Sequence, residues 1–163
     1  MTFESTGKAF NHMTIRRDGS GQVVGWLGER AFALCLMENN IPFYWVAPTK
    51  AEFDFIVKHE GKVITVDVKS KERNVSNAGY LDAHVTVEQK EYDCKIYVFA
   101  NVIKDTKEVQ LCGWLSKAEF WRKARIVEKG DSDGNLVEHK HAGKVKHKDL
   151  RDMESLIIPL RMA

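Results

Sequence analysis

A long hydrophobic run near the start of the chain predicts a helix, and the segments after it predict strands. Residues 22–38 are apolar at most positions and end ahead of Pro42, which favours a helix over this range. A helix that is apolar all round is expected to be buried. Three short segments rich in β-branched and aromatic residues follow, and they predict strands at 43–46, 53–57 and 63–69.

The middle of the chain alternates between polar and apolar segments. Residues 70–84 are polar, which predicts an irregular stretch. Thr86 and Gln89 have the spacing of a capping box and predict the start of a short helix. Residues 95–102 are apolar almost throughout, which predicts a strand buried on both faces.

The last third of the chain predicts one more strand and two more helices. The strand is expected at 108–114. Ser116 and Glu119 form a second capping-box pattern and predict a helix that ends near residue 125. A short helix is also expected at 149–156. The resulting order, α-β-β-β-α-β-β-α, predicts an α/β fold with a mixed β-sheet core flanked by helices.

Length and composition indicate one globular domain. The chain has 163 residues, of which 44% are hydrophobic and 29% charged, as is typical of a protein with a packed core. We expect residues 1–18 to form a flexible N-terminal arm and residues 19–163 to form a single domain. A basic C-terminal extension is expected from about residue 126.

The distribution of apolar residues argues against a membrane protein. No apolar run approaches the roughly 18–20 residues that cross a bilayer, and residues 1–18 lack the apolar segment of a signal peptide. We therefore expect a cytoplasmic protein with no membrane partner. The odd number and wide spacing of Cys35, Cys94 and Cys112 predict buried free thiols.

Two acids and a lysine come together if the strands around Glu60-Gly61 form a tight hairpin. In that register Asp54 faces Asp67, and Lys69 lies on the same face as Asp67 because side chains alternate along a strand. Directly opposed like charges destabilise a sheet, and a cation between them removes the repulsion. Mg²⁺ prefers one or two carboxylates together with water and phosphate oxygens, so the pair suits that ion.

A purely structural explanation of these residues remains open. A bulge in the hairpin shifts the pairing by one residue and separates the two acids. In the structural alternative, Asp54 and Asp67 are acids at a sheet edge that face solvent, with Lys69 as a salt-bridge partner.

The first predicted helix contributes a third acid, Glu29. A carboxylate on a buried helix is costly unless it is paired or binds a metal. Arg30 is the structural alternative as a partner, although adjacent residues do not face each other on a helix.

Together these residues resemble the PD-(D/E)XK nuclease superfamily. Its pattern is a helix-borne glutamate, an aspartate on one strand and an acid-x-lysine triplet on the next, which correspond here to Glu29, Asp54 and Asp67-Val68-Lys69. The resemblance covers roughly residues 20–102, and its first half looks most like the archaeal-type Holliday junction resolvases. Phe53 stands in place of the proline that gives the motif its name, and many members of the superfamily also lack that proline.

The resemblance implies a restriction-endonuclease-like fold and a Mg²⁺-dependent DNA endonuclease, with Mn²⁺ as a substitute ion. Asp54 and Asp67 would bind the metal with the Val68 carbonyl, and Glu29 would bind it directly or through water. Lys69 would orient the attacking water and supply positive charge for the phosphate. The family also implies a homodimer, and it implies no organic cofactor.

Several polar residues are candidate DNA contacts. Lys71 and Arg73 follow the motif, and Gln89 and Lys90 open the short helix, where Gln89 has a capping role as its alternative. The net charge of +2 permits nucleic-acid binding without arguing for it. A run from 139 to 148 contains no acid and is either a phosphate-contacting patch or a solvated basic loop; its lysines are Lys140, Lys144, Lys146 and Lys148.

Three functions remain open on the sequence. The first is a junction-resolving endonuclease, and the second is a sequence-specific endonuclease of restriction or homing type, for which residues 103–163 supply the extra material. The third is a non-catalytic nucleic-acid-binding protein on the same fold, which the intact acids and lysine disfavour.

Overall fold

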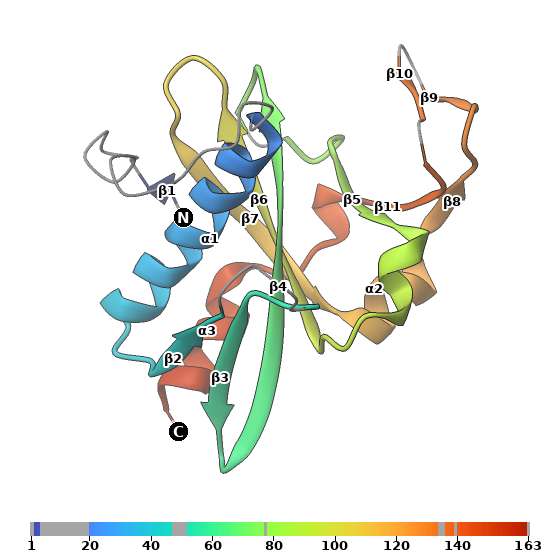
Figure 1. Cartoon of the computed structure of the whole chain (residues 1–163). Coiled ribbons are helices and arrows are strands. Elements are labelled where there is room, and N and C mark those ends of the chain that lie inside the picture. Colours follow the sequence, from blue (N-terminus) through green and yellow to red (C-terminus); the bar gives the residue numbers. More distant parts are fainter. Residues whose placement is uncertain are drawn as a thin grey trace.

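A six-stranded mixed sheet forms the centre of the fold (Figure 1). The computed structural model describes residues 2–3, 20–46, 52–76, 78–133, 136–138 and 140–162. Strands β4 and β6 are parallel to each other, and the remaining neighbours are antiparallel. In spatial order the strands are β1 (Thr2–Phe3), β7 (Val109–Ser116), β6 (Ile96–Ile103), β4 (Lys62–Arg73), β3 (Phe55–His59) and β2 (Phe43–Trp45).

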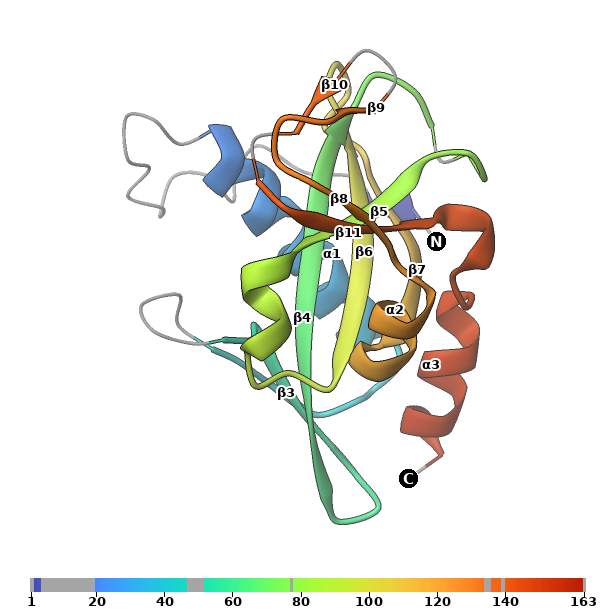
Figure 2. The same ribbon diagram turned by 90° about the vertical axis from the view of Figure 1, so that its right-hand side faces the viewer.

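Other elements cover the two faces of this sheet. Helices α1 (Ser20–Glu38) and α3 (Met153–Arg161) pack on one face. Helix α2 (Lys117–Lys123) and a smaller three-stranded sheet lie on the other, where the smaller sheet crosses β4 and β6 (Figure 2). That sheet has the order β5 (Asp82–Thr86), β11 (Ala142–Lys146), β8 (Arg125–Val127).

Short elements complete the chain. A 3₁₀-helix, η2, links β5 to β6, and a second, η3, follows β11. Strands β9 and β10 pair with each other as a separate hairpin. The bounds of these elements are η2 (Val87–Glu91), β9 (Ser132–Asp133), β10 (Leu136–Val137) and η3 (His147–Asp149).

Strand β6 separates two hydrophobic cores. Val98 and alternate residues face α1 and α3, whereas Tyr97 and Phe99 face α2 and the smaller sheet. All residues of β6 except the last are buried, which confirms the prediction of a strand buried on both faces. Strand β4, beside β6, contributes Val66 and Val68 to the core beneath α1, and its other face is polar.

Gly28 lets α1 approach β4 and β6 closely. A methyl group built on Gly28 would lie 1.8 Å from the Ser70 hydroxyl oxygen and 3.3 Å from the Cβ of Ala100. The helix and the sheet therefore meet where α1 has no side chain. This contact also brings the next residue, Glu29, closer to the sheet.

The first helix is less buried than its composition predicts. One side of α1 packs on the sheet, and Leu27, Phe32 and Leu36 are fully buried there. Trp26 is only half-buried, and Met37 is 61% exposed. The prediction of burial on all sides is wrong because the sheet covers only one face of the helix.

Three other expectations about elements need correction. Residues 70–84 are not irregular throughout, because β4 continues to Arg73 and β5 begins at Asp82. The side chain of Thr86 forms no capping hydrogen bond, and the turn after it is a 3₁₀-helix. The final helix begins later than expected, with Asp152 as its N-cap. A strand with few apolar residues gives no hydrophobic pattern in the sequence. It is therefore missed when the strands that it pairs with are distant in the chain.

The region from about residue 126 is integrated in the fold. Strand β11 lies between β5 and β8, so the run expected as a basic loop or patch is largely the central strand of the smaller sheet. By contrast, the capping box at Ser116 and Glu119 is confirmed. The expected N-terminal arm falls almost entirely outside the described residues.

All three cysteines are free thiols, as predicted. Cys35 and Cys94 are buried, whereas Cys112 is half-buried. Among the described helices, none combines the length and the apolar character that crossing a bilayer requires.

Two glycines on α1 are expected to respond in opposite ways to alanine. Gly28→Ala should lower the free energy of unfolding by about 1–3 kcal/mol, because the added methyl group clashes with the sheet. Gly25→Ala should raise it by up to about 1 kcal/mol, because nothing lies within 4 Å and alanine restricts the unfolded chain. Urea denaturation of both variants measures the difference, and equal effects would contradict the close helix–sheet contact.

Candidate active site

The β3–β4 hairpin has the register predicted from the sequence. Ile56 pairs with Thr65, and Lys58 pairs with Val63. Glu60 and Gly61 both have positive φ, at 49° and 72°, as a two-residue type I′ turn requires. The tight turn therefore fixes the alignment of the two strands.

The register brings Asp54, the residue before the start of β3, close to Asp67 on β4. The Asp54 amide donates to the Val66 carbonyl at 2.9 Å, next to the last pair of the ladder, Phe55 with Val66. The Asp54 carboxylate accepts a hydrogen bond from the Val68 amide at 2.7 Å. Asp67 is 5% exposed, so the alternative of an acid at a solvent-facing edge is wrong for this residue.

Lys69 lies one pleat beyond Asp67 on the same face of β4. Its Nζ is 2.6 Å from a carboxylate oxygen of Asp67, and its side chain is 17% exposed. Lys69 is thus a salt-bridge partner of Asp67, as the structural alternative also supposed. The charge of its ammonium also acts on Glu29.

Glu29 reaches this cluster from α1 and is held by a residue that the sequence did not single out. Trp45 Nε1 donates a hydrogen bond to Glu29 Oε2 at 2.7 Å. The Trp45 ring stacks on Phe55 with centroids 5.5 Å apart and an interplanar angle of 20°. Trp45, on the edge strand β2, therefore connects the helix-borne acid to the β3–β4 hairpin.

The three acids disturb one another electrostatically. Burial, followed by the charges of Asp67 and Glu29, raises the pKa of Asp54 to about 8. Burial also raises the pKa of Glu29, and the hydrogen bond from Trp45 partly opposes this shift. The site therefore contains more carboxylates than its single nearby lysine neutralises.

The donors present suit a hard divalent cation. Asp54 and Asp67 offer carboxylate oxygens, and Val68 between Asp67 and Lys69 offers a backbone carbonyl. Among the residues that the structure describes, no three His, Cys, Asp or Glu side chains lie close enough together to hold a metal ion. Because Mg²⁺ keeps several waters and needs only one or two carboxylates, the Asp54–Asp67 pair fits its chemistry.

The other candidates near the motif lie along the same face. Lys71 and Arg73 follow Lys69 on β4, and both are half-buried. An Arg73 guanidinium nitrogen donates to the Asp82 carbonyl at 2.7 Å. Gln89 and Lys90 lie on η2, where the Lys90 ammonium is 5.6 Å from the centre of the Trp121 ring.

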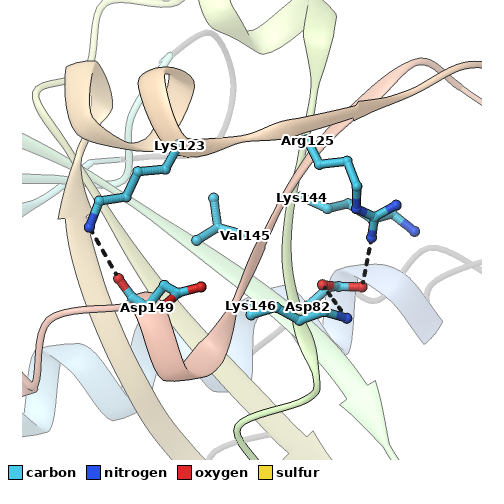
Figure 3. A pocket seen from close by; sticks show the side chains of 7 residues that line it. All are labelled: Asp82, Lys123, Arg125, Lys144, Val145, Lys146 and Asp149. Carbon is cyan, nitrogen blue, oxygen red and sulfur yellow. Dashed lines mark hydrogen bonds and ion pairs between the residues drawn. The ribbon is translucent and has the colours of Figure 1, made fainter.

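The four lysines of the basic run are placed in different ways. Lys144 is buried and paired with Glu138, so it does not present its charge to a ligand in solution. Lys146 lies 3.1 Å from Asp82, in a hollow of about 410 Å³ with Lys123 and Arg125 (Figure 3). Lys140 is exposed and 3.8 Å from Glu88, and Lys148 is exposed.

Similarity to known proteins is confined to structure. No protein-family model and no curated protein sequence matches the chain. The structure of a bacterial homing endonuclease superposes with a TM-score of 0.50 and 14% identity, over 88% of this chain and 93% of that chain. The Holliday junction resolvase Hjc of the archaeal hyperthermophile Archaeoglobus fulgidus gives a TM-score of 0.47 and 9% identity, over 82% and 94%.

These comparisons bear on the fold. The expected fold class, a mixed sheet flanked by helices of the restriction-endonuclease-like type, is confirmed by the sheet and by its likeness to the homing endonuclease. At such low identity the likeness does not extend to activity.

The raised pKa of Asp54 predicts a pH-dependent stability in EDTA. Its value of about 8 in the folded state exceeds the unfolded value of about 3.9. The folded state thus binds the Asp54 proton more tightly than the unfolded state does. The stabilisation that this proton gives is complete below about pH 4 and is lost as pH rises through about 8. Asp54→Asn should remove this loss.

Chemical denaturation from pH 5 to 9 measures the effect. The wild type should lose stability relative to Asp54→Asn as pH rises, whereas Asp105→Asn in the exposed β6–β7 turn should follow the wild type. Parallel curves for the wild type and Asp54→Asn would contradict the crowding of the carboxylates.

Proposed function

We propose that the chain is a metal-dependent DNA endonuclease that hydrolyses phosphodiester bonds. The observation that carries this proposal is the arrangement of Asp54 opposite Asp67, with Lys69 one pleat further and Glu29 approaching from α1. A packed fold has no need to place a half-buried carboxylate beside a buried one, because their mutual repulsion and desolvation reduce stability. Such a cluster is therefore better explained by a cation that it holds.

Each residue of the cluster has a role in this proposal. Asp54, Asp67 and the Val68 carbonyl would hold Mg²⁺, or Mn²⁺ in its place, and Glu29 would bind directly or through water. The metal supplies a water nucleophile near neutral pH and neutralises charge on the phosphate. Lys69 orients the attacking water and adds a positive charge beside the phosphate. Trp45 holds the Glu29 carboxylate in position.

The surroundings of the cluster suit DNA. Lys71 and Arg73 extend a row of cations away from Lys69 along β4, and phosphate groups of a nucleic-acid strand are attracted to such a row. Exposed Lys90, Lys140 and Lys148 are further candidates for contacts with the backbone. The fold is shared with a homing endonuclease, which is compatible with this chemistry.

For the substrate, we propose a DNA junction first. The chain would then be a junction-resolving endonuclease that acts as a homodimer, because paired cuts in two strands require two sites.

The smaller sheet supports a second candidate for the substrate. The hollow lined by Lys123, Arg125 and Lys146 lies on the smaller sheet, outside the elements that carry the acids. Lysine and arginine outnumber the two acids that also line this hollow, Asp82 and Asp149, and this additional surface favours a sequence-specific endonuclease as the alternative.

Substitutions at the cluster should separate cleavage from binding. Asp67→Asn and Lys69→Ala should each lower the cleavage rate by about 10²- to 10³-fold or more, because each removes a charge that acts on the phosphate or its metal. Both should leave DNA affinity and folding largely intact. Lys104→Ala and Asp105→Asn, in the exposed β6–β7 turn, are the matched controls and should cleave as the wild type does.

The measurement is a cleavage assay in Mg²⁺ with a labelled four-way junction, a linear duplex and long plasmid DNA. Symmetric cuts confined to the junction indicate a resolving enzyme and a dimer. Discrete fragments of plasmid with an intact junction indicate a sequence-specific enzyme. Binding that survives EDTA without cleavage in Mg²⁺ or Mn²⁺ would refute the catalytic proposal and leave a non-catalytic DNA-binding protein.

A further inference from the structure

A small polar cavity lies beyond Lys69, between the main sheet and the smaller sheet. Its volume is about 50 Å³, enough for a few atoms the size of a water molecule. The cavity is separate from the carboxylate pair, because neither acid lines it. Six of the polar residues that line it are Lys69, Lys71, Arg73, His84, Asn101 and His147.

Two buried N–H donors in this cavity have no hydrogen-bond partner within the described part of the chain. They are Nδ2 of Asn101 and Nε of Arg73. Asn101 is only 1% exposed, and it pairs across the sheet with Lys71. Buried donors are almost always satisfied in folded proteins, so two that share one cavity indicate an acceptor that binds there.

The charge around the cavity is mainly positive. Burial lowers the pKa of Lys71, and the nearby charges of Arg73 and Lys144 lower it further, against Glu138 and Asp82. The acid on the cavity wall is Asp82. Its carboxylate lies 3.1 Å from the Lys146 ammonium and 3.5 Å from the Arg125 guanidinium (Figure 3).

The acceptor that matches these features is an oxyanion. It offers several oxygen acceptors to Asn101 and Arg73 and a negative charge to Lys69 and Lys71. The volume of about 50 Å³ matches a group of a few atoms such as one phosphate. Both histidines have lowered pKa values because they are buried, so they add little charge at neutral pH.

We propose that this cavity binds a second phosphate of the DNA strand, within one or two nucleotides of the phosphate that is cleaved. Lys71 follows Lys69 by two residues along β4, a separation of about 7 Å in an extended strand. A phosphate held by Asn101 and Arg73 would thus set the position of the DNA strand relative to Asp54 and Asp67. The proposal rests on the proposed function for the source of the phosphate.

Asn101→Leu tests the cavity without DNA or metal. Leucine has a similar size and no N–H group, and no bond of Nδ2 is lost on its introduction. In EDTA, inorganic phosphate should raise the Tm of the wild type above its value in chloride of equal ionic strength, because a ligand that binds the folded state stabilises it. The variant should fold and show no such rise.

A second variant tests the same cavity independently, so that a folding defect in Asn101→Leu does not decide the result. Lys71→Gln, at a half-buried position, removes a charge and keeps most of the side chain. It should weaken phosphate binding about tenfold or more, in line with the loss of one charge-assisted contact. Lys104→Ala in the β6–β7 turn is the matched control and should respond to phosphate as the wild type does.

Neutral backbone substitutions then test the DNA strand as the source. Binding is measured in Ca²⁺ with DNA in which a single methylphosphonate is moved along the strand past the cleavage position. One substitution near that position should weaken wild-type binding about ten- to hundredfold and leave the affinity of Asn101→Leu nearly unchanged.

Each other outcome overturns a defined part of the proposal. An equal rise in Tm for the wild type and Asn101→Leu places the anion elsewhere, and no rise for either shows that the cavity holds only water. A rise in Tm confined to the wild type, together with no effect of any methylphosphonate on DNA binding, would mean that the ligand of the cavity is free phosphate or a mononucleotide. The DNA strand would then be excluded as the ligand. Because the thermal measurement needs neither metal nor DNA, its result stands even if no substrate is cleaved.

Discussion

The alternation of side chains along β4 is the constraint on which the rest of the molecule depends. One face of the strand supplies Val66 and Val68 to the core beneath α1. The other face carries Asp67, Lys69 and the cations that follow them. A shift of one residue in the hairpin would exchange the two sets and bury charge against α1. Hydrophobic packing on one side therefore fixes the chemistry on the other.

The part of the site that the sequence predicts is the part built from local contacts. The turn at Glu60-Gly61 sets the register that brings Asp54 close to Asp67, and both the turn and the alternating pattern are visible in the sequence from Asp54 to Lys69. The position of Glu29 on a helix is likewise visible. Its partner Trp45 is not, because aromatic residues on a short strand are equally expected in a core.

The rest of the site depends on contacts between distant segments. Asn101 lies within an apolar strand, where a single amide gives no pattern, and its cavity exists only because β5 and β11 cross β4. Lys144 has the composition of a phosphate contact, yet the pairing of β11 turns it toward Glu138. Propensity and periodicity do not encode such pairings, and they therefore misassign polar strands.

The two halves of the site also differ in how far apart in the chain their contacts lie. The hydrogen bond that joins Asp54 to Val68 spans 14 residues, whereas the one that anchors Lys146 to Tyr80 in the smaller sheet spans 66. Closing a short loop costs less conformational entropy than closing a long one, and local contacts accordingly form earlier during folding. The acids are thus expected to meet before the wall of the cavity closes over the cations. The carboxylate half of the site would then form before the half that contains the cavity.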